Sequence, residues 1–130
     1  MLAGDVTPSD QARLERAIRN ADQASQELTF SLYLGATDGP PRAVAEALHA
    51  ELTSPETSVL VLCDPEKRAL EIVTGTLARR ILTDAECALA AASMESSFAG
   101  GDIVGGLVVG IQQLGEAARA PRMLHLQRRN

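Results

Sequence analysis

The feature that most constrains the fold is the stretch SVLVLCDPEKRALEIVT, residues 58–74, which joins an uninterrupted apolar run to a turn. Val59 to Cys63 contains no polar residue, as expected of a central strand that is covered on both faces. Asp64-Pro65 suits the first two positions of a type I turn, and residues 69–74 then predict a partner strand. The pattern therefore predicts a hairpin whose first strand needs helices on both sides.

Caps and hydrophobic periodicity place the remaining elements. Thr7-Pro8 starts a first helix, and T-D-A-E at residues 83–86 is a full capping box for a later one. Helices are predicted over 8–25, 41–52, 84–97 and from the cap Asp102 to about Ala118, and a further strand over 28–34.

The resulting order, α-β-α-β-β-α-α, predicts an α/β fold: a small three-layer α/β/α sandwich with a mostly central mixed sheet. The first two strands are joined by a helix and should be parallel, whereas the hairpin strands are antiparallel. The start of the second strand and the end of the third then meet at one edge of the sheet. We expect a single domain over residues 5–119 and a C-terminal tail over 120–130.

Composition limits the partners and the compartment. The chain has 130 residues, a net charge of −5, no Trp, one Tyr and two Phe, so aliphatic side chains must build the core. The acidic balance argues against nucleic acid, and the arginines near the C-terminus lack the interleaved aromatics that stack on bases. The longest apolar stretch, IVGGLVVGI, is too short to span a bilayer. With no signal-peptide pattern and two cysteines that suit buried positions, Cys63 and Cys87, we expect a cytoplasmic protein.

Glycines are frequent in the last predicted helix, FAGGDIVGGLVVGIQQLGEAA, although each interior glycine weakens a helix by roughly 0.5–1 kcal/mol relative to Ala. Gly106 and Gly110 are four residues apart and share one side, where they permit close approach of a neighbour. Gly100 and Gly101 fit a sharp turn before Asp102. A phosphate-cradling loop is not favoured, because neither G-x-x-x-x-G-K-[ST] nor G-x-G-x-x-G is present.

Nearly the whole chain resembles the TPM domain, and more closely an actinobacterial branch of unknown function. The matching stretches are VLVLCDPEKR, IVTGTLARRILTD (residues 72–84) and FAGGDIVGGLVVG (residues 98–110). They are similar to a hairpin G-V-L-L-L-V-x-x-x-x-R, a segment G-Y-G-L-E followed by L-[PT]-D, and F-x-x-G-[DN]-[YI]-x-x-G-[LI]-x-x-G.

This resemblance implies an acid phosphatase domain that binds a divalent metal in some members. The chain departs from it in three places: ETS, residues 56–58, replaces an acidic D-[ND]-G, Leu77 replaces the second glycine of G-Y-G, and Arg79 replaces an acidic residue. A guanidinium is never a metal ligand. The resemblance therefore implies a retained pocket with altered chemistry, in which Gly75, Arg79 and Arg80 bind a ligand. An alternative set of metal ligands is Glu56, Asp84 and Asp102, which would suit Ca²⁺ or Mg²⁺.

Each candidate also has a purely structural explanation. Asp84 lies in the first turn of a helix and Asp102 at a cap, and Arg79-Arg80 is typical of a solvated surface. His49 lies among Ala and Glu, and we expect it to be exposed. No nucleophile motif is present, so no catalytic residue is assigned.

Two hypotheses remain. In the first, the protein is a non-catalytic binding or regulatory module with no cofactor, whose partner is a protein or a small anionic ligand. In the second, it is a weak metal-dependent acid phosphatase.

Overall fold

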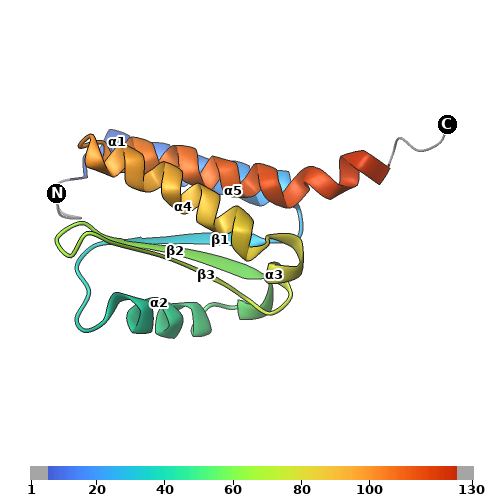
Figure 1. Ribbon diagram of the computed structural model, residues 1–130, viewed down its shortest axis with the longest axis horizontal. Helices are drawn as coiled ribbons and strands as arrows, with labels where there is room; N and C mark the ends of the chain where they lie inside the picture. The colour runs from blue at the N-terminus through green and yellow to red at the C-terminus, as the bar shows by residue number, and fades with distance from the viewer. Residues whose placement is uncertain (1–5, 126–130) are drawn as a thin grey trace.

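Helices cover both faces of the central strand, as the sequence predicts. In this computed structural model, which describes the backbone of residues 6–125 and the side chains of residues 6–119, α2 lies on one side of a three-stranded sheet and α1, α4 and α5 lie on the other (Figure 1). The elements are α1 (Pro8–Ser25), β1 (Thr29–Leu34), α2 (Pro41–Ala50), the 3₁₀-helix η2 (Pro55–Thr57), β2 (Ser58–Asp64), β3 (Ala69–Thr74), α3 (Ala78–Ile81), α4 (Asp84–Ala99) and α5 (Ile103–His125).

The sheet has the order β1-β2-β3, with β1 parallel and β3 antiparallel to β2. This mixed pairing confirms the predicted α/β sandwich. We call the end where β2 begins and β3 ends the Gly75 end of the sheet. The opposite end, where β2 runs into the turn toward β3, is the Asp64 end.

Every residue of β2 is buried, and its side chains alternate between two hydrophobic cores. Val59, Val61 and Cys63 belong to the larger core, which also includes residues of α1, α4 and α5. Leu60 and Leu62 belong to a smaller core formed with α2. The uninterrupted apolar run is therefore the consequence of burial on both faces.

The predicted helix caps are confirmed. The hydroxyl of Thr83 accepts a hydrogen bond from the N–H of Glu86 at 3.2 Å, and the Glu86 carboxylate accepts one from the N–H of Thr83 at 2.9 Å. Asp102 caps α5 by accepting a hydrogen bond from the N–H of Gly105 at 2.9 Å. Gly101 has φ of +90°, in the region that glycine adopts without strain, and so forms the expected turn.

Some element bounds differ from the predictions. No element is predicted over η2 or α3, and each is a single short helical turn. The last helix, α5, continues to His125 rather than ending near Ala118. Pro121 removes one N–H donor but has a φ that suits a helix. Residues 126–130 of the expected tail lie outside the described residues.

Glycines bring α5 into close contact with two neighbouring helices, as predicted for Gly106 and Gly110. A Cβ placed on Gly106 would lie 2.8 Å from Cβ of Ser97 in α4, and one on Gly110 would collide with the side chain of Met94. A third position, Gly115, faces α1, where a Cβ would lie 2.8 Å from Cα of Ala21. Burial between packed helices offsets the weak helix propensity of these glycines.

Within the described part of the chain, no helix combines the length and the apolar character that crossing a membrane requires.

Gly115→Ala is expected to lower the stability of the protein. The added methyl group would press on the backbone of α1, which cannot move aside as a flexible side chain can, and overpacking of this kind costs roughly 1–3 kcal/mol. Alanine regains up to about 1 kcal/mol of helix propensity, so we expect a net loss of about 1 kcal/mol in urea unfolding. The control is Val109→Ala in the same helix, where the side chain is 52% exposed. A Gly115→Ala midpoint equal to or above that of the wild type would contradict the packing role.

Candidate functional site

The Gly75 end of the sheet is held together by backbone contacts. The N–H of Gly75 donates to the carbonyl of Ser58, and the N–H of Leu77 donates to the carbonyl of Glu56, both at 3.0 Å. A Cβ on Gly75 would collide with the carbonyl oxygen of Pro55 and would lie 2.5 Å from that of Glu56. Glycine is therefore required here because η2 lies against it.

Beside this contact lies an open hollow of about 310 Å³, which we call the Arg79 depression. Arg79 donates a hydrogen bond from Nη2 to the carbonyl of Thr74 at 3.2 Å, which holds its exposed guanidinium at the rim. Of the predicted ligand-binding residues, Gly75 and Arg79 line this hollow, and Arg80 does not. The lining residues are His49, Pro55, Glu56, Thr74, Gly75, Thr76 and Arg79.

The prediction that His49 is exposed is wrong, because only 8% of its surface is exposed. Its Nε2 lies 3.0 Å from the carbonyl oxygen of Ser58, which can only accept, so Nε2 carries the hydrogen. The neighbouring Ala and Glu residues suggested a solvated position. The better signal is the four-residue spacing from Ala45, which places both residues on the face of α2 that is packed on the sheet.

The alternative metal ligands come from three different segments of the chain. Glu56 is exposed in η2 at the Gly75 end, and Asp84 is exposed in the first turn of α4. Asp102 lies in the turn between α4 and α5, next to Ile103, which lines a hollow together with Asp64. Among residues 6–119, no three His, Cys, Asp or Glu side chains are grouped so that they could hold a metal ion.

A buried carboxylate organises the Asp64 end. Asp64 is 1% exposed and accepts hydrogen bonds from the N–H and the hydroxyl of Thr37 at 2.8 and 2.7 Å. It also accepts from the N–H groups of Glu66 and Lys67 in the turn, at 3.1 and 3.3 Å. The hydrogen bond from the Thr37 hydroxyl is the main cause of a lowered pKa for Asp64, against the opposing effect of burial. The sequence indicated the turn but not this link to the loop after β1, because Thr37 is 27 residues away.

The ammonium group of Lys67 reinforces the link between Asp64 and the loop after β1. Its Nζ donates to the carbonyl oxygens of Thr37 and Gly39 at 2.7 and 2.8 Å. The loop after β1 and the turn after β2 are therefore joined by both a carboxylate and an ammonium group.

The two thiols are poor nucleophiles. Cys63 and Cys87 are both free, and burial is the main cause that raises the pKa of each to about 11. Both are protonated at neutral pH, and reactivity requires the thiolate. Cys63 is buried as predicted, whereas Cys87 is only partly buried.

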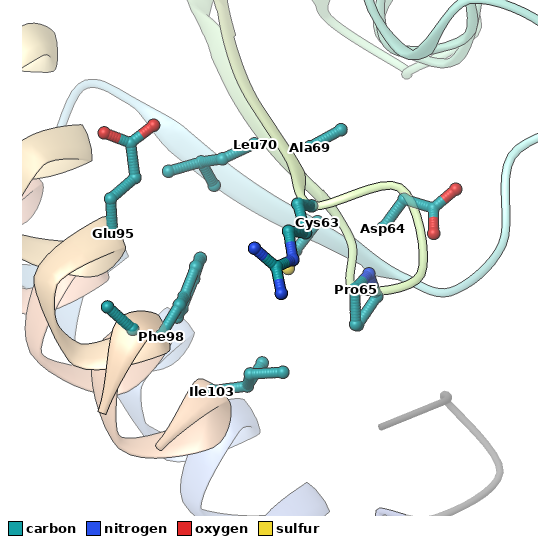
Figure 2. A pocket seen from close by; sticks show the side chains of 10 residues that line it. Cys63, Asp64, Pro65, Ala69, Leu70, Glu95, Phe98 and Ile103 are labelled. Carbon is teal, nitrogen blue, oxygen red and sulfur yellow. The ribbon is translucent and has the colours of Figure 1, made fainter. Parts of the chain in front are cut away.

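The larger of the two hollows described here lies at the Asp64 end, between the β2–β3 turn and the turn that joins α4 to α5. It has a volume of about 490 Å³, and we call it the Arg68 cleft (Figure 2). The lining residues are Cys63, Asp64, Pro65, Arg68, Ala69, Leu70, Glu95, Phe98, Ala99 and Ile103. Local sequence patterns do not predict this cleft, because its walls come from residues 63–70 and 95–103, which only the fold brings together.

Fold and geometry define a small α/β sandwich domain with an open hollow at each end of its sheet. The chain belongs to the family described as "Domain of unknown function (DUF5130)", whose model matches residues 5–115.

Relatives in Mycobacterium tuberculosis support the actinobacterial branch of unknown function. The uncharacterized proteins Rv2468c of strain H37Rv and MT2543 of strain CDC 1551 are each 28% identical over 106 residues. Each alignment covers 82% of this chain and 63% of the relative, so this chain spans less than two thirds of their length.

Solved structures show the same fold. The N-terminal domain of cg2496 from Corynebacterium glutamicum matches with a TM-score of 0.72 and 21% identity, over 89% of this chain and 76% of that one. BA42 from Bizionia argentinensis matches with a TM-score of 0.69 and 22% identity, over 88% of this chain and 81% of that one. At this level of identity the likeness concerns the fold alone.

Asp64→Asn is expected to destabilise the protein in a pH-dependent manner. Because the folded-state pKa lies below the unfolded value of about 3.9, the carboxylate stabilises the fold above that pH. The contribution is lost as the pH falls through the folded-state pKa. The urea midpoint of the variant should therefore lie below that of the wild type at pH 7, and the two should converge under acidic conditions. Asp38→Asn, at an exposed position in the loop after β1 next to Thr37, is the control. A difference that is constant with pH would contradict this role of the charge.

Proposed function

We propose that this protein is a non-catalytic binding or regulatory module whose Arg79 depression holds an anionic group of a small ligand or a protein partner. The observation that carries the proposal is the exposed Arg79 guanidinium at the rim of the hollow. A guanidinium has five N–H donors, and the hydrogen bond to Thr74 uses one of them. The remaining donors suit a phosphate or a carboxylate, to which arginine binds in a bidentate manner.

The charge around the depression supports the same class of ligand. Arg80 adds a second positive charge next to Arg79 in the sequence, and Glu56 contributes the one carboxylate among the lining residues. A cation in this hollow would experience the fixed charge of Arg79, which at 4 Å and an effective dielectric constant of 20 repels by about 4 kcal/mol before solvent exposure weakens it. The sign of this interaction favours an anion.

The thiols and the candidate carboxylates Asp84 and Asp102 support a binding function over a catalytic one. Both thiols have a pKa raised to about 11. Asp102 is engaged as the cap of α5, where it accepts a hydrogen bond from Gly105. Asp84 lies in the first turn of α4, where a negative charge stabilises the helix through its dipole.

We also propose that this chain is a divergent relative of the TPM domain and that it acts in the cytoplasm. The motif glycines Gly106 and Gly110 have a clear structural role in the packing of α5, which accounts for their place in a shared pattern. Two free cysteines suit a reducing compartment.

Arg79→Ala is expected to weaken the binding of inorganic phosphate by about tenfold to a hundredfold, since hydrogen bonds to charged groups contribute about 1.5–3 kcal/mol. Binding is measured from backbone amide shifts in ¹H–¹⁵N spectra during titration with phosphate and, separately, with acetate. Arg19→Ala, at an exposed position of α1, is the matched control and should bind as the wild type does.

A second set of measurements addresses the phosphatase alternative. Calcium and magnesium are titrated by calorimetry, and hydrolysis of a generic phosphomonoester is followed with and without each ion. The binding-module proposal would be overturned by metal-dependent turnover that is lost in Asp84→Asn or Asp102→Asn. Anion binding that is unchanged in Arg79→Ala would remove the Arg79 depression as its site.

A further inference from the structure

The Arg68 cleft combines apolar walls with one guanidinium. Leu70 of β3, Phe98 of α4 and Ile103 of α5 line it, and Arg68 enters from the turn between β2 and β3. Its volume of about 490 Å³ lies within the range of small-molecule sites, which are mostly apolar with a few placed polar groups.

The guanidinium of Arg68 has no hydrogen-bond or ion-pair partner among the described residues. Glu95, the other exposed charge on the cleft wall, is not paired with it, and Figure 2 shows the Glu95 carboxylate on the far side of the cleft from Asp64. The Asp64 carboxylate points away from the cleft in the same view, consistent with its hydrogen bonds to Thr37.

The backbone at Arg68 adds a second observation. Its φ is +52°, in the left-handed region that usually favours glycine or asparagine, and its N–H donates to the carbonyl of Pro65 at 3.2 Å to close the turn. A side chain with a Cβ is strained in this conformation, because the Cβ comes close to the following carbonyl oxygen. Arginine is therefore held where a glycine would be less strained, with its side chain at the cleft.

We propose that the Arg68 cleft is a binding site for a small monocarboxylate with an apolar body, such as a medium-chain alkanoate. Arg68 binds the carboxylate in a bidentate manner, and Leu70, Phe98 and Ile103 cover the apolar body. One guanidinium matches one negative charge, and the carboxylates of Glu95 and Asp64 near the same hollow repel a dianion such as phosphate more strongly than a monoanion. The site is separate from the Arg79 depression, at the opposite end of the sheet.

Octanoate is the probe, and binding is followed on the whole chain from backbone amide shifts in ¹H–¹⁵N spectra and by calorimetry. Octanol supplies the same apolar body without the charge, acetate the charge without the body, and inorganic phosphate the dianion. We expect saturable binding of octanoate with shifts in the β2–β3 turn and the end of α4. Octanol and acetate should each bind at least tenfold more weakly.

Two variants test the two halves of the site. Arg68→Gln keeps a long side chain but removes the charge, and it should weaken octanoate binding at least tenfold. Ala99→Phe fills the cleft from an exposed position at the end of α4 and should block binding without disturbing the core. Arg19→Ala, at an exposed position of α1, is the matched control and should leave octanoate binding unchanged. Amide shifts at residues 63–70 report the Arg68 cleft and shifts at residues 74–79 report the Arg79 depression, so the failure of this proposal is distinguishable from the failure of the proposed function.

Three results would overturn the proposal. The first is equal binding of octanoate and octanol, or octanoate binding that persists in Arg68→Gln. The second is phosphate binding at the cleft that is tighter than octanoate binding. The third is an absence of saturable octanoate binding, including the case in which cleft signals shift with protein concentration alone, which would assign the cleft to a second copy of the chain.

Discussion

The close contact of α5 with α1 and α4 is the interaction on which the rest of the structure depends. Gly106 and Gly110 admit the side chains of α4, and Gly115 admits the backbone of α1. This contact fixes the three helices as one layer, and that layer supplies most of the larger core on its face of the sheet. It also fixes the turn at Gly101, and with it the wall of the Arg68 cleft formed by Phe98 and Ile103.

A second, polar constraint acts at the Asp64 end of the sheet. The carboxylate of Asp64 accepts hydrogen bonds from both the loop after β1 and the turn after β2. Lys67 then returns from that turn to two carbonyl groups of the loop. An ionised carboxylate can be buried here because donors from two segments surround it. The turn that carries Arg68 is therefore anchored at the residue where it starts.

Much of the fold could be predicted from the sequence because its signals are local. The apolar run of β2, the capping box at Thr83 and the turn glycines each lie within one short segment, and each prediction is confirmed. The prediction that His49 is exposed was wrong, because its burial depends on which face of α2 meets the sheet. The link between Asp64 and Thr37 and the walls of the Arg68 cleft depend on residues distant in sequence. Local patterns carry no information about such pairs, and the ligand-binding roles of Arg79 and Arg80 stay predictions.

The contact between η2 and Gly75 has a consequence for how this surface can change. The carbonyl oxygen of Glu56 accepts a hydrogen bond from Leu77, and the carbonyl oxygen of Pro55 lies against Gly75. Every amino acid has a backbone carbonyl group, and the Glu56 side chain itself is exposed. Position 56 can therefore exchange acidic, basic or neutral side chains while the loop keeps its path. Only the partner position, Gly75, is restricted to one residue type. Proteins that share this fold can therefore change the charge at the rim of the depression by single substitutions while the backbone structure is kept.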